Sequence, residues 1–411
     1  MLVSDKLSSV ELPKGGVFDV LSKASMLEKS IGKDKVIKSI IGSLFDENEE
    51  FFVLPSVNSA FRNLPDIDIF NYTGSITGSD DFKNSVKKNL LIDNLPNVEV
   101  SASVGGSGAI SNVFRAYLGE GQTALLPNYR WESYETMVRA NNSKIETYNL
   151  FDGDAFNMDD FSAKLLNIVK RDKKVVVVIN DPCHNPTGYS LSIDEWKNVV
   201  EILKQAGQYG DIILVNDIAY IDYDFRGYKE SRQHFQLFAD LPQNVLTIIA
   251  FSISKSLTSY GLRVGASVAI SSNADVITEY NNSINVLCRT TWSNISRGGI
   301  ELFIKINKEQ SLFDAVNKER NDAINLLKQR TEVFTSKAKQ IGLRYLPFRS
   351  GFFFTIPVDN SIKGSVIDDL EKQNAFVVPV DNGLRIAICS LPIEKSAKLP
   401  ELLKKSIDKY V

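Results

Sequence analysis

A lysine and an arginine eight residues apart are the most informative residues for chemistry. The segment Ser252-Ile253-Ser254-Lys255 follows the apolar run Leu246–Phe251, and Arg263 comes after it. If that run is a strand of a parallel sheet, Lys255 lies at the carboxyl edge, where ligands bind in such sheets. A desolvated lysine amine is a nucleophile, and a guanidinium beside a serine hydroxyl suits a phosphate. The alternative is a lysine and an arginine on an ordinary solvated loop.

Three further motifs lie where other apolar runs end. Asn180–Gly188, which contains Asn185, offers an amide after one run, and Asn216-Asp217-Ile218-Ala219-Tyr220 offers a carboxylate after another. An aspartate in such a place can pair with a positive ligand nitrogen. Val104–Ile110 carries a Gly-Gly-Ser-Gly sequence between a predicted strand and a predicted helix, where glycines and free helix N–H groups favour an anion. Each motif alone is also explained as a turn, a helix cap or a tight connection.

The elements that must position these residues are a mostly parallel sheet and its covering helices. Between residues 98 and 270, short apolar, β-branched runs alternate with segments of helical spacing. Continuous rather than alternating hydrophobicity is typical of strands buried on both faces, so the sequence predicts an α/β fold. We expect a large domain over 46–296 and a smaller α+β domain over 297–411, which the N-terminal segment 1–45 joins.

Composition excludes several classes of protein. The chain has 411 residues, 43% of them hydrophobic and 24% charged, which is ordinary for a globular protein. A net charge of −3 gives little attraction to nucleic acid or to anionic lipid. No apolar run approaches the length of a membrane span and no secretory signal is visible, so neither a nucleic acid nor a membrane is expected as a partner.

Cysteine and histidine content narrows the chemistry further. Cys183, Cys288 and Cys389 are far apart and odd in number, which favours structural thiols in a reducing cytoplasm. The two histidines cannot build a histidine-rich metal site, so no metal is predicted. We interpret His184 as a turn residue and His234 as a surface residue. Proton transfer near neutral pH must then come from another group.

Taken in order, the four motifs resemble the fold-type I aminotransferases that use pyridoxal 5'-phosphate (PLP), in the aspartate and aromatic amino-acid branch. The resemblance runs from Ile41-Gly42 to Arg385. It implies a cytoplasmic homodimer with shared active sites and a large PLP-binding domain. It also implies transfer of an amino group between an amino acid (aspartate, glutamate or an aromatic one) and a 2-oxo acid, with PLP held as a Schiff base on Lys255.

The resemblance assigns the other cofactor contacts residue by residue. Lys255 is also the general acid and base, Asp217 pairs with the pyridine nitrogen, and Asn185 and Tyr220 hydrogen-bond the 3-oxygen. Trp131 stacks on the ring, with Tyr129 as the alternative because the spacing from Pro127 is longer than usual. The phosphate group is bound by several residues, one of them from the other subunit: Gly106, Ser107, Ser252, Arg263 and the other subunit's Tyr72.

Substrate recognition follows from the same resemblance. Arg385 is similar to the arginine that clamps the α-carboxylate, and Gly42 to the backbone position that closes over the substrate. Arg289, three residues before Trp292-Ser293-Asn294, resembles the arginine that crosses the interface to bind a second carboxylate. The alternative for Arg289 is a surface arginine. Departures from the family pattern at 256–259 and 295–297 leave the choice of substrate side chain open.

Two rival functions share this resemblance. A PLP-dependent β- or γ-lyase of the same fold would use the same cofactor residues. A PLP-binding regulator would carry a DNA-binding helix-turn-helix, but residues 1–45 contain no basic recognition helix. The aminotransferase is the favoured reading because Arg289 suits a dicarboxylate substrate.

Overall fold

The chain divides into two units with separate hydrophobic cores. The computed structural model describes residue 10 and residues 16–411. The first unit contains 53–182 and 191–320, and the second contains 16–52, 183–190 and 321–411. Helix α13 (Gln310–Gln340) belongs to both, since the chain passes from one unit to the other within it. The division into domains at 46 and 297 that the sequence suggests stays a prediction.

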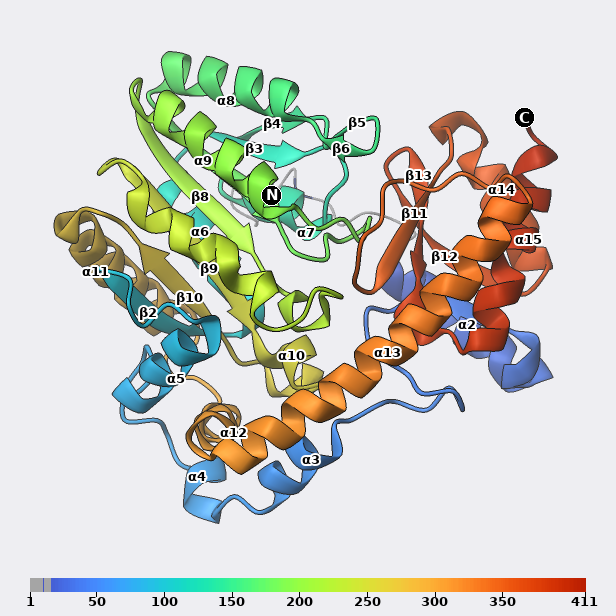
Figure 1. The fold of residues 1–411 in the computed structure, drawn as a ribbon, viewed down its shortest axis with the longest axis horizontal. Helices are drawn as coiled ribbons and strands as arrows, with labels where there is room; N and C mark the ends of the chain where they lie inside the picture. Colours follow the sequence, from blue (N-terminus) through green and yellow to red (C-terminus); the bar gives the residue numbers. More distant parts are fainter. Residues whose placement is uncertain (1–9, 11–15) are drawn as a thin grey trace, which may run out of the picture. The chain divides into compact units, whose positions relative to one another are not determined.

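A seven-stranded sheet forms the centre of the first unit (Figure 1). Strand β10 is antiparallel to both of its neighbours, and the other neighbouring pairs are parallel. The predicted α/β class with a mostly parallel sheet is therefore confirmed. In spatial order the strands are β2 (Val98–Ser103), β10 (Gly265–Ile270), β9 (Val245–Ser252), β8 (Asp211–Asp217), β7 (Lys174–Asn180), β3 (Thr123–Pro127) and β4 (Lys144–Tyr148).

Helices cover both faces of this sheet, which explains why its central strands read as unbroken apolar runs. Val176 and Val178 of β7 belong to the cluster that also buries residues of α6 (Gly105–Tyr117) and α11 (Ala274–Thr291). Successive side chains of a strand point to opposite faces, so the intervening valines of β7 face the other way. There β7 packs against α8 (Met158–Asp172) and β8 against α9 (Ile193–Gly207).

Shorter elements complete the first unit. Helix α12 (Arg297–Lys308) packs against α3, α4 and α5. The remaining elements are α3 (Pro55–Arg62), α4 (Asp66–Phe70), α5 (Asp80–Leu90), α7 (Ser133–Ala140), β5 (Phe151–Asp152), β6 (Ala155–Phe156), η2 (Ile221–Tyr223), η3 (Glu230–Asp240), α10 (Ile253–Ser256) and η4 (Tyr260–Leu262).

The second unit is built on a four-stranded sheet in the order β1 (Ile37–Ser39), β12 (Ala375–Val380), β13 (Gly383–Ala387) and β11 (Phe353–Pro357). Strand β1 pairs in parallel with β12, so the N-terminal part of the chain shares a sheet with the C-terminal part. A small core joins them, formed by residues of α2 (Val17–Ile31), β12 and the segment around β1. The other elements are η1 (Lys33–Lys35), α14 (Asn360–Lys372), η5 (Ile388–Ser390) and α15 (Ile393–Asp408).

Among the residues that the structure describes, none of the helices combines the length and the apolar character that crossing a membrane requires.

His234 is buried, and its interpretation as a surface residue is wrong. Its side chain is 3% exposed and its ring stacks on Trp196 of α9, with ring centroids 4.6 Å apart. Its Nε2 lies 3.0 Å from Oδ1 of Asn216, the residue before Asp217. Burial lowers the pKa of His234 to about 3, so the ring is neutral and structural.

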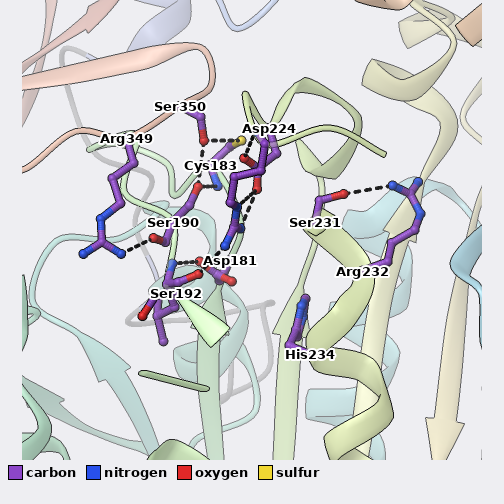
Figure 2. A network of polar contacts seen from close by, with 12 residues as sticks. Asp181, Cys183, Ser190, Ser192, Asp224, Ser231, Arg232, His234, Arg349 and Ser350 are labelled. Carbon is purple, nitrogen blue, oxygen red and sulfur yellow. Dashed lines mark hydrogen bonds and ion pairs between the residues drawn. The ribbon is translucent and has the colours of Figure 1, made fainter. Parts of the chain in front are cut away.

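A buried ion cluster ties three separate segments of the first unit together. Asp222 of η2 accepts from Arg232 at 2.6 Å through Oδ1, and its Oδ2 lies 2.8 Å from Nη1 of Arg320. Arg232 also donates to Oγ of Ser231 at 3.1 Å (Figure 2). Burial raises the pKa of Asp222, but the two guanidinium groups outweigh that effect and the net pKa lies below the usual value.

Replacing Asp222 with Asn should lower the free energy of unfolding by about 3–5 kcal/mol, because two buried arginines lose their counter-charge. In the wild type this contribution is present at neutral pH and is lost as the pH falls through the depressed folded pKa. Urea denaturation followed by circular dichroism measures both effects. The exposed pair Asp194–Lys197 provides the control, since D194N should change stability by only about 0.5 kcal/mol. Equal effects of the two substitutions would contradict this account.

Candidate active site

Strand register brings the chemical residues of the first unit to one edge of the seven-stranded sheet. Asn180 at the end of β7 pairs with Asp217 at the end of β8, and Asp217 pairs with Ala250 near the end of β9. On the other side, Gly265 at the start of the reversed strand β10 pairs with Ser252 and with Ser103. The ends of five adjacent strands therefore meet along a single edge, which is where parallel α/β sheets bind ligands.

An anion-binding corner lies at the β2–α6 connection. Helix α6 begins at Gly105, has no side-chain cap and no acidic residue in its first turn, and so presents N–H groups to an anion. Gly105 has φ +64°, and a Cβ built on it would lie 2.6 Å from Nη2 of Arg263. The guanidinium is positioned by donation from Nη1 to Ser254 Oγ at 3.0 Å and to the Tyr260 carbonyl at 2.9 Å.

Ser252 closes the other side of this corner. A Cβ built on Gly106 would lie 3.6 Å from the Ser252 Cβ, so the two residues are in contact range. Ser107 follows in the first turn of α6. Guanidinium, hydroxyl and helix N–H groups around one point suit a dianionic phosphate, as the sequence predicts for these residues.

Asp217 is a buried carboxylate held by two donors. It is 5% exposed, its Oδ2 accepts from the Tyr134 hydroxyl, and its Oδ1 accepts from the Ala219 N–H at 3.1 Å. Burial raises the pKa of Asp217, against the lowering effects of Tyr134, Ala219 and the nearby charge of Lys255. A carboxylate of this kind is stabilised in its charged form by a cationic ligand group.

Tyr134 is the functional residue that the sequence reasoning missed. It is fully buried at the start of α7, and burial followed by the charge of Asp217 raises its pKa well above the usual value, so its hydroxyl remains a donor. The sequence feature that could have drawn attention to Tyr134 is its position three residues after Trp131. The Trp131 ring meets it edge-on, with centroids 5.4 Å apart, whereas the Tyr129 ring lies 6.5 Å from that of Phe151. These contacts associate Trp131 with Asp217 through Tyr134.

Lys255 lies on α10, directly after β9, and is half-buried. Its Nζ is 5.2 Å from the centroid of the Tyr220 ring. Tyr220 follows Asp217 by three residues and is 6% exposed. The lysine, the tyrosine and the aspartate that the sequence singles out therefore belong to one cluster.

The arginine that the sequence assigns to the substrate carboxylate is buried in the second unit. Arg385 on β13 is 7% exposed, donates from Nη1 to Asn185 Oδ1 at 3.2 Å and from Nη2 to the Ile40 carbonyl at 2.8 Å. Its guanidinium carbon is 4.5 Å from the centroid of the Phe353 ring. Gly42, half-buried, comes two residues after Ile40. The planar guanidinium is thus held in a fixed orientation, as two-point recognition of a carboxylate requires.

Two further predicted residues are exposed on the surface of the first unit. Tyr72 is 80% exposed, and its carbonyl accepts from Arg297 at 3.2 Å. Arg289 near the end of α11 is exposed and donates from Nη1 to Ser293 Oγ at 2.9 Å. Their predicted roles require a second copy of the chain and stay predictions.

The fold and the clustered lysine, aspartate and arginine define a PLP-dependent enzyme of fold type I. Residues 41–403 match the family model described as aminotransferase class I and II, and the chain belongs to this family. A solved aminotransferase structure from Anaerococcus prevotii has a TM-score of 0.94 and 31% identity, and the match covers 99% of this chain and 100% of that one.

Curated relatives match over shorter stretches. The aromatic-amino-acid aminotransferase of Pseudomonas aeruginosa is 28% identical over 217 residues, which are 52% of each chain. The aspartate aminotransferase of the same organism is 29% identical over 199 residues, which are 48% of each chain. The matched part of the chain thus spans about half the length of these two relatives.

The residues present fit the cofactor on which this family depends. The close approach of Gly105 to the Arg263 guanidinium, where even a methyl group would collide, leaves the helix N-terminus open to a phosphate. The buried Asp217 carboxylate, with its pKa raised by burial, suits a protonated ring nitrogen.

Replacing Gly105 with Ala should weaken PLP binding about tenfold or more, because the new methyl group displaces the Arg263 guanidinium. Spectrophotometric titration of the cofactor-depleted protein with PLP measures the affinity. The control is G121A, since Gly121 has φ +73° but nothing within 4 Å of a built Cβ. That variant carries the same backbone strain and should bind PLP like the wild type. A similar loss in both variants would mean that strain, rather than the displaced arginine, is responsible.

Proposed function

We propose that the chain is an aminotransferase that moves an amino group between an amino acid and a 2-oxo acid with PLP as cofactor. The observation that carries the proposal is the group formed by Lys255, Tyr220 and the Tyr134-bound Asp217 at the sheet edge that also bears Arg263. Family membership supports it independently.

Cofactor binding divides between two groups of side chains. The N–H groups of α6, with Ser107, Ser252 and Arg263, bind the phosphate. Asp217, oriented by Tyr134 and by its own backbone, pairs with the ring nitrogen and keeps it protonated. When bound, PLP supplies an aldehyde for the substrate amine and a ring that accepts the electron pair left at Cα. Trp131 stacks on that ring.

Lys255 moves the proton. Its Nζ would hold the cofactor, and its free amine would take the proton from Cα of the substrate. The chain has only two histidines, and the buried His234 has its pKa lowered to about 3, so it cannot serve as a base near neutral pH. Tyr220, beside Lys255, hydrogen-bonds the 3-oxygen together with Asn185.

Arg385 binds the α-carboxylate of the substrate. In the structure its two terminal nitrogens donate to an amide oxygen and to a carbonyl, both uncharged acceptors. A carboxylate is a stronger acceptor and matches the planar fork, so exchange of these partners favours substrate binding. Gly42 closes over the bound substrate.

Aspartate, glutamate and aromatic amino acids are the proposed substrates. Arg289 binds the second carboxylate of a dicarboxylic substrate from across a dimer interface, and the two Pseudomonas relatives act on aspartate and on aromatic amino acids by name. Arg289 is exposed and donates a side-chain hydrogen bond to Ser293 Oγ, which a charged carboxylate could replace as a stronger acceptor.

The active enzyme is proposed to be a homodimer in the cytoplasm, with Tyr72 of each subunit reaching the phosphate in the other. Exposed apolar residues next to Tyr72 support a second copy on this face, since Ile67 is 58% exposed and Phe70 is 81% exposed. The three cysteines are buried and free, which suits a reducing compartment.

Replacing Lys255 with Ala should lower kcat for transamination by about 10³-fold or more, since the covalent anchor and the proton carrier are lost together. The visible absorbance of the lysine-bound cofactor should disappear as well. Steady-state kinetics and absorbance spectra of the purified protein measure these effects. The exposed Lys197 gives the control variant K197A, which should behave like the wild type. Turnover retained in a correctly folded K255A protein would overturn the proposed function.

Replacing Arg289 with Leu should lower kcat/KM for aspartate about 100-fold and leave that for phenylalanine within about threefold, because only the dicarboxylate loses a charged partner. The half-reaction, conversion of the PLP form to the pyridoxamine form, is followed spectrally with all twenty amino acids. R139L, which removes another exposed arginine, is the control. A wild-type preference for purely aliphatic amino acids would refute the role of Arg289.

A further inference from the structure

Arg297 is a residue to which the proposed function assigns no role. It lies in the segment 295–297, where the sequence departs from the family pattern, and it is the first residue of α12. A cation is unfavourable there, because a helix N-terminus carries partial positive charge. Neither a capping side chain nor an acidic residue in the first turn of α12 offsets that charge. Local conflicts of this kind are typical of functional positions.

The start of α12 packs against α4, the helix that ends two residues before Tyr72 (Figure 1). Gly298 brings the two backbones close, since a Cβ built on it would already lie 3.5 Å from Cα of Ile69. The guanidinium of Arg297 reaches α4 from this position, and its Nη2 donates to Oδ1 of Asp68 at 2.8 Å. The side chain of Arg297 is 20% exposed, so this ion pair is partly shielded from water.

A second guanidinium nitrogen fixes the backbone of Tyr72. Nη1 of Arg297 donates to the Tyr72 carbonyl at 3.2 Å, while the Tyr72 N–H donates to Oδ1 of Asn71 at 2.8 Å. The next residue is held in the same way. The Thr73 N–H donates to Oδ1 of Asn294 at 3.1 Å, and the Thr73 carbonyl accepts from Nδ2 of Asn294 at 3.3 Å. All four backbone polar groups of this two-residue segment thus have side-chain partners.

The fixed backbone of Tyr72 contrasts with the exposure of its side chain, which is 80% exposed. Surface segments outside helices and strands are usually mobile, and water can satisfy their polar backbone groups. Ordering the backbone of an exposed aromatic residue in advance reduces the entropy that is lost when a partner binds it. The arrangement therefore favours contact between Tyr72 and another molecule.

We propose that Arg297 is a positioning residue for Tyr72, and that it acts on the PLP phosphate site of the other subunit without touching the cofactor. The inference rests on the proposed function, in which Tyr72 crosses the dimer interface to that phosphate. One nitrogen of the planar guanidinium bonds Asp68 on α4 and the other bonds the Tyr72 carbonyl, so the tyrosine backbone is fixed relative to α4 and α12. Without the guanidinium, the Tyr72 hydroxyl is in place for the phosphate only part of the time.

A double-mutant cycle tests the proposal, with spectrophotometric titration of the cofactor-depleted proteins by PLP as the measurement. Y72F removes the phosphate contact itself and should weaken binding about tenfold, and R297M should weaken it about fivefold. Because Arg297 acts through Tyr72, the double variant should bind only about tenfold more weakly than the wild type. Independent effects would multiply to about fiftyfold, and that result would overturn the proposal.

Two control variants separate positioning from stability. D68N leaves an amide oxygen for Arg297, so it should lower the melting temperature as R297M does, while PLP affinity stays within about twofold of the wild type. R62M removes an exposed arginine of α3 and should change neither property. An equal loss of PLP affinity in D68N and R297M would overturn the proposal, and so would a change of oligomeric state in R297M.

Mixed dimers, isolated with two different affinity tags, test whether the effect is in the other subunit. In a hybrid of R297M with K255A, the subunit that keeps Lys255 receives Tyr72 from the subunit whose Arg297 is intact. The absorbance of the lysine-bound cofactor reports only this site, and its PLP affinity should return to within about twofold of the wild type. A defect that persists in the hybrid would overturn the proposal.

The single variants distinguish failure of this inference from failure of the proposed function. If Y72F weakens PLP binding and R297M does not, the role of Arg297 is wrong and the proposed function stands. If R297M weakens PLP binding and Y72F does not, the role of Arg297 and the proposed role of Tyr72 are both wrong.

Discussion

A carboxylate buried at the end of a central strand is the constraint on which the rest of the first unit depends. Asp217 is 5% exposed, and its two oxygens are held by the Tyr134 hydroxyl and the Ala219 N–H. Neutral donors orient the group but do not balance its charge, so burial still raises its pKa. The proposed partner of this carboxylate is the positively charged nitrogen of the cofactor ring, which would offset the unfavourable desolvation of Asp217.

At the β2–α6 connection, the proposed phosphate site depends on the absence of a side chain at Gly105. Gly105 allows the guanidinium of Arg263 to lie against the first turn of α6, where any Cβ would collide. Helix N–H groups and a guanidinium then converge without an intervening carboxylate. In the proposed function, the buried carboxylate of Asp217 and this positive corner, which lie at the same sheet edge, bind the two ends of the cofactor.

Sequence patterns predicted the architecture and most of the first-unit cluster, because parallel strands buried on both faces leave unbroken apolar runs. Asp217 and Lys255 follow such runs, and Arg263 is singled out by its spacing from Lys255, so all three could be proposed from the sequence. Tyr134 was missed because a tyrosine in an amphipathic helix looks like an ordinary core residue, and only the fold reveals its bond to Asp217. His234 was misjudged because its stacking on Trp196 depends on packing between α9 and η3, which the sequence does not show. Roles that need a second subunit, for Tyr72 and Arg289, remain predictions.

The reversed direction of β10 limits the changes in chain length that the protein tolerates between β9 and β10. Because β10 runs against β9, the chain leaves and re-enters the sheet at the same edge, and residues 253–264 never travel to the far side. The length of this short connection therefore fixes the distance between Lys255 and Arg263. The longer crossovers between parallel strands can accommodate insertions, deletions or new chain ends. In the short connection, inserting or deleting even one residue would change the relative positions of Lys255 and Arg263.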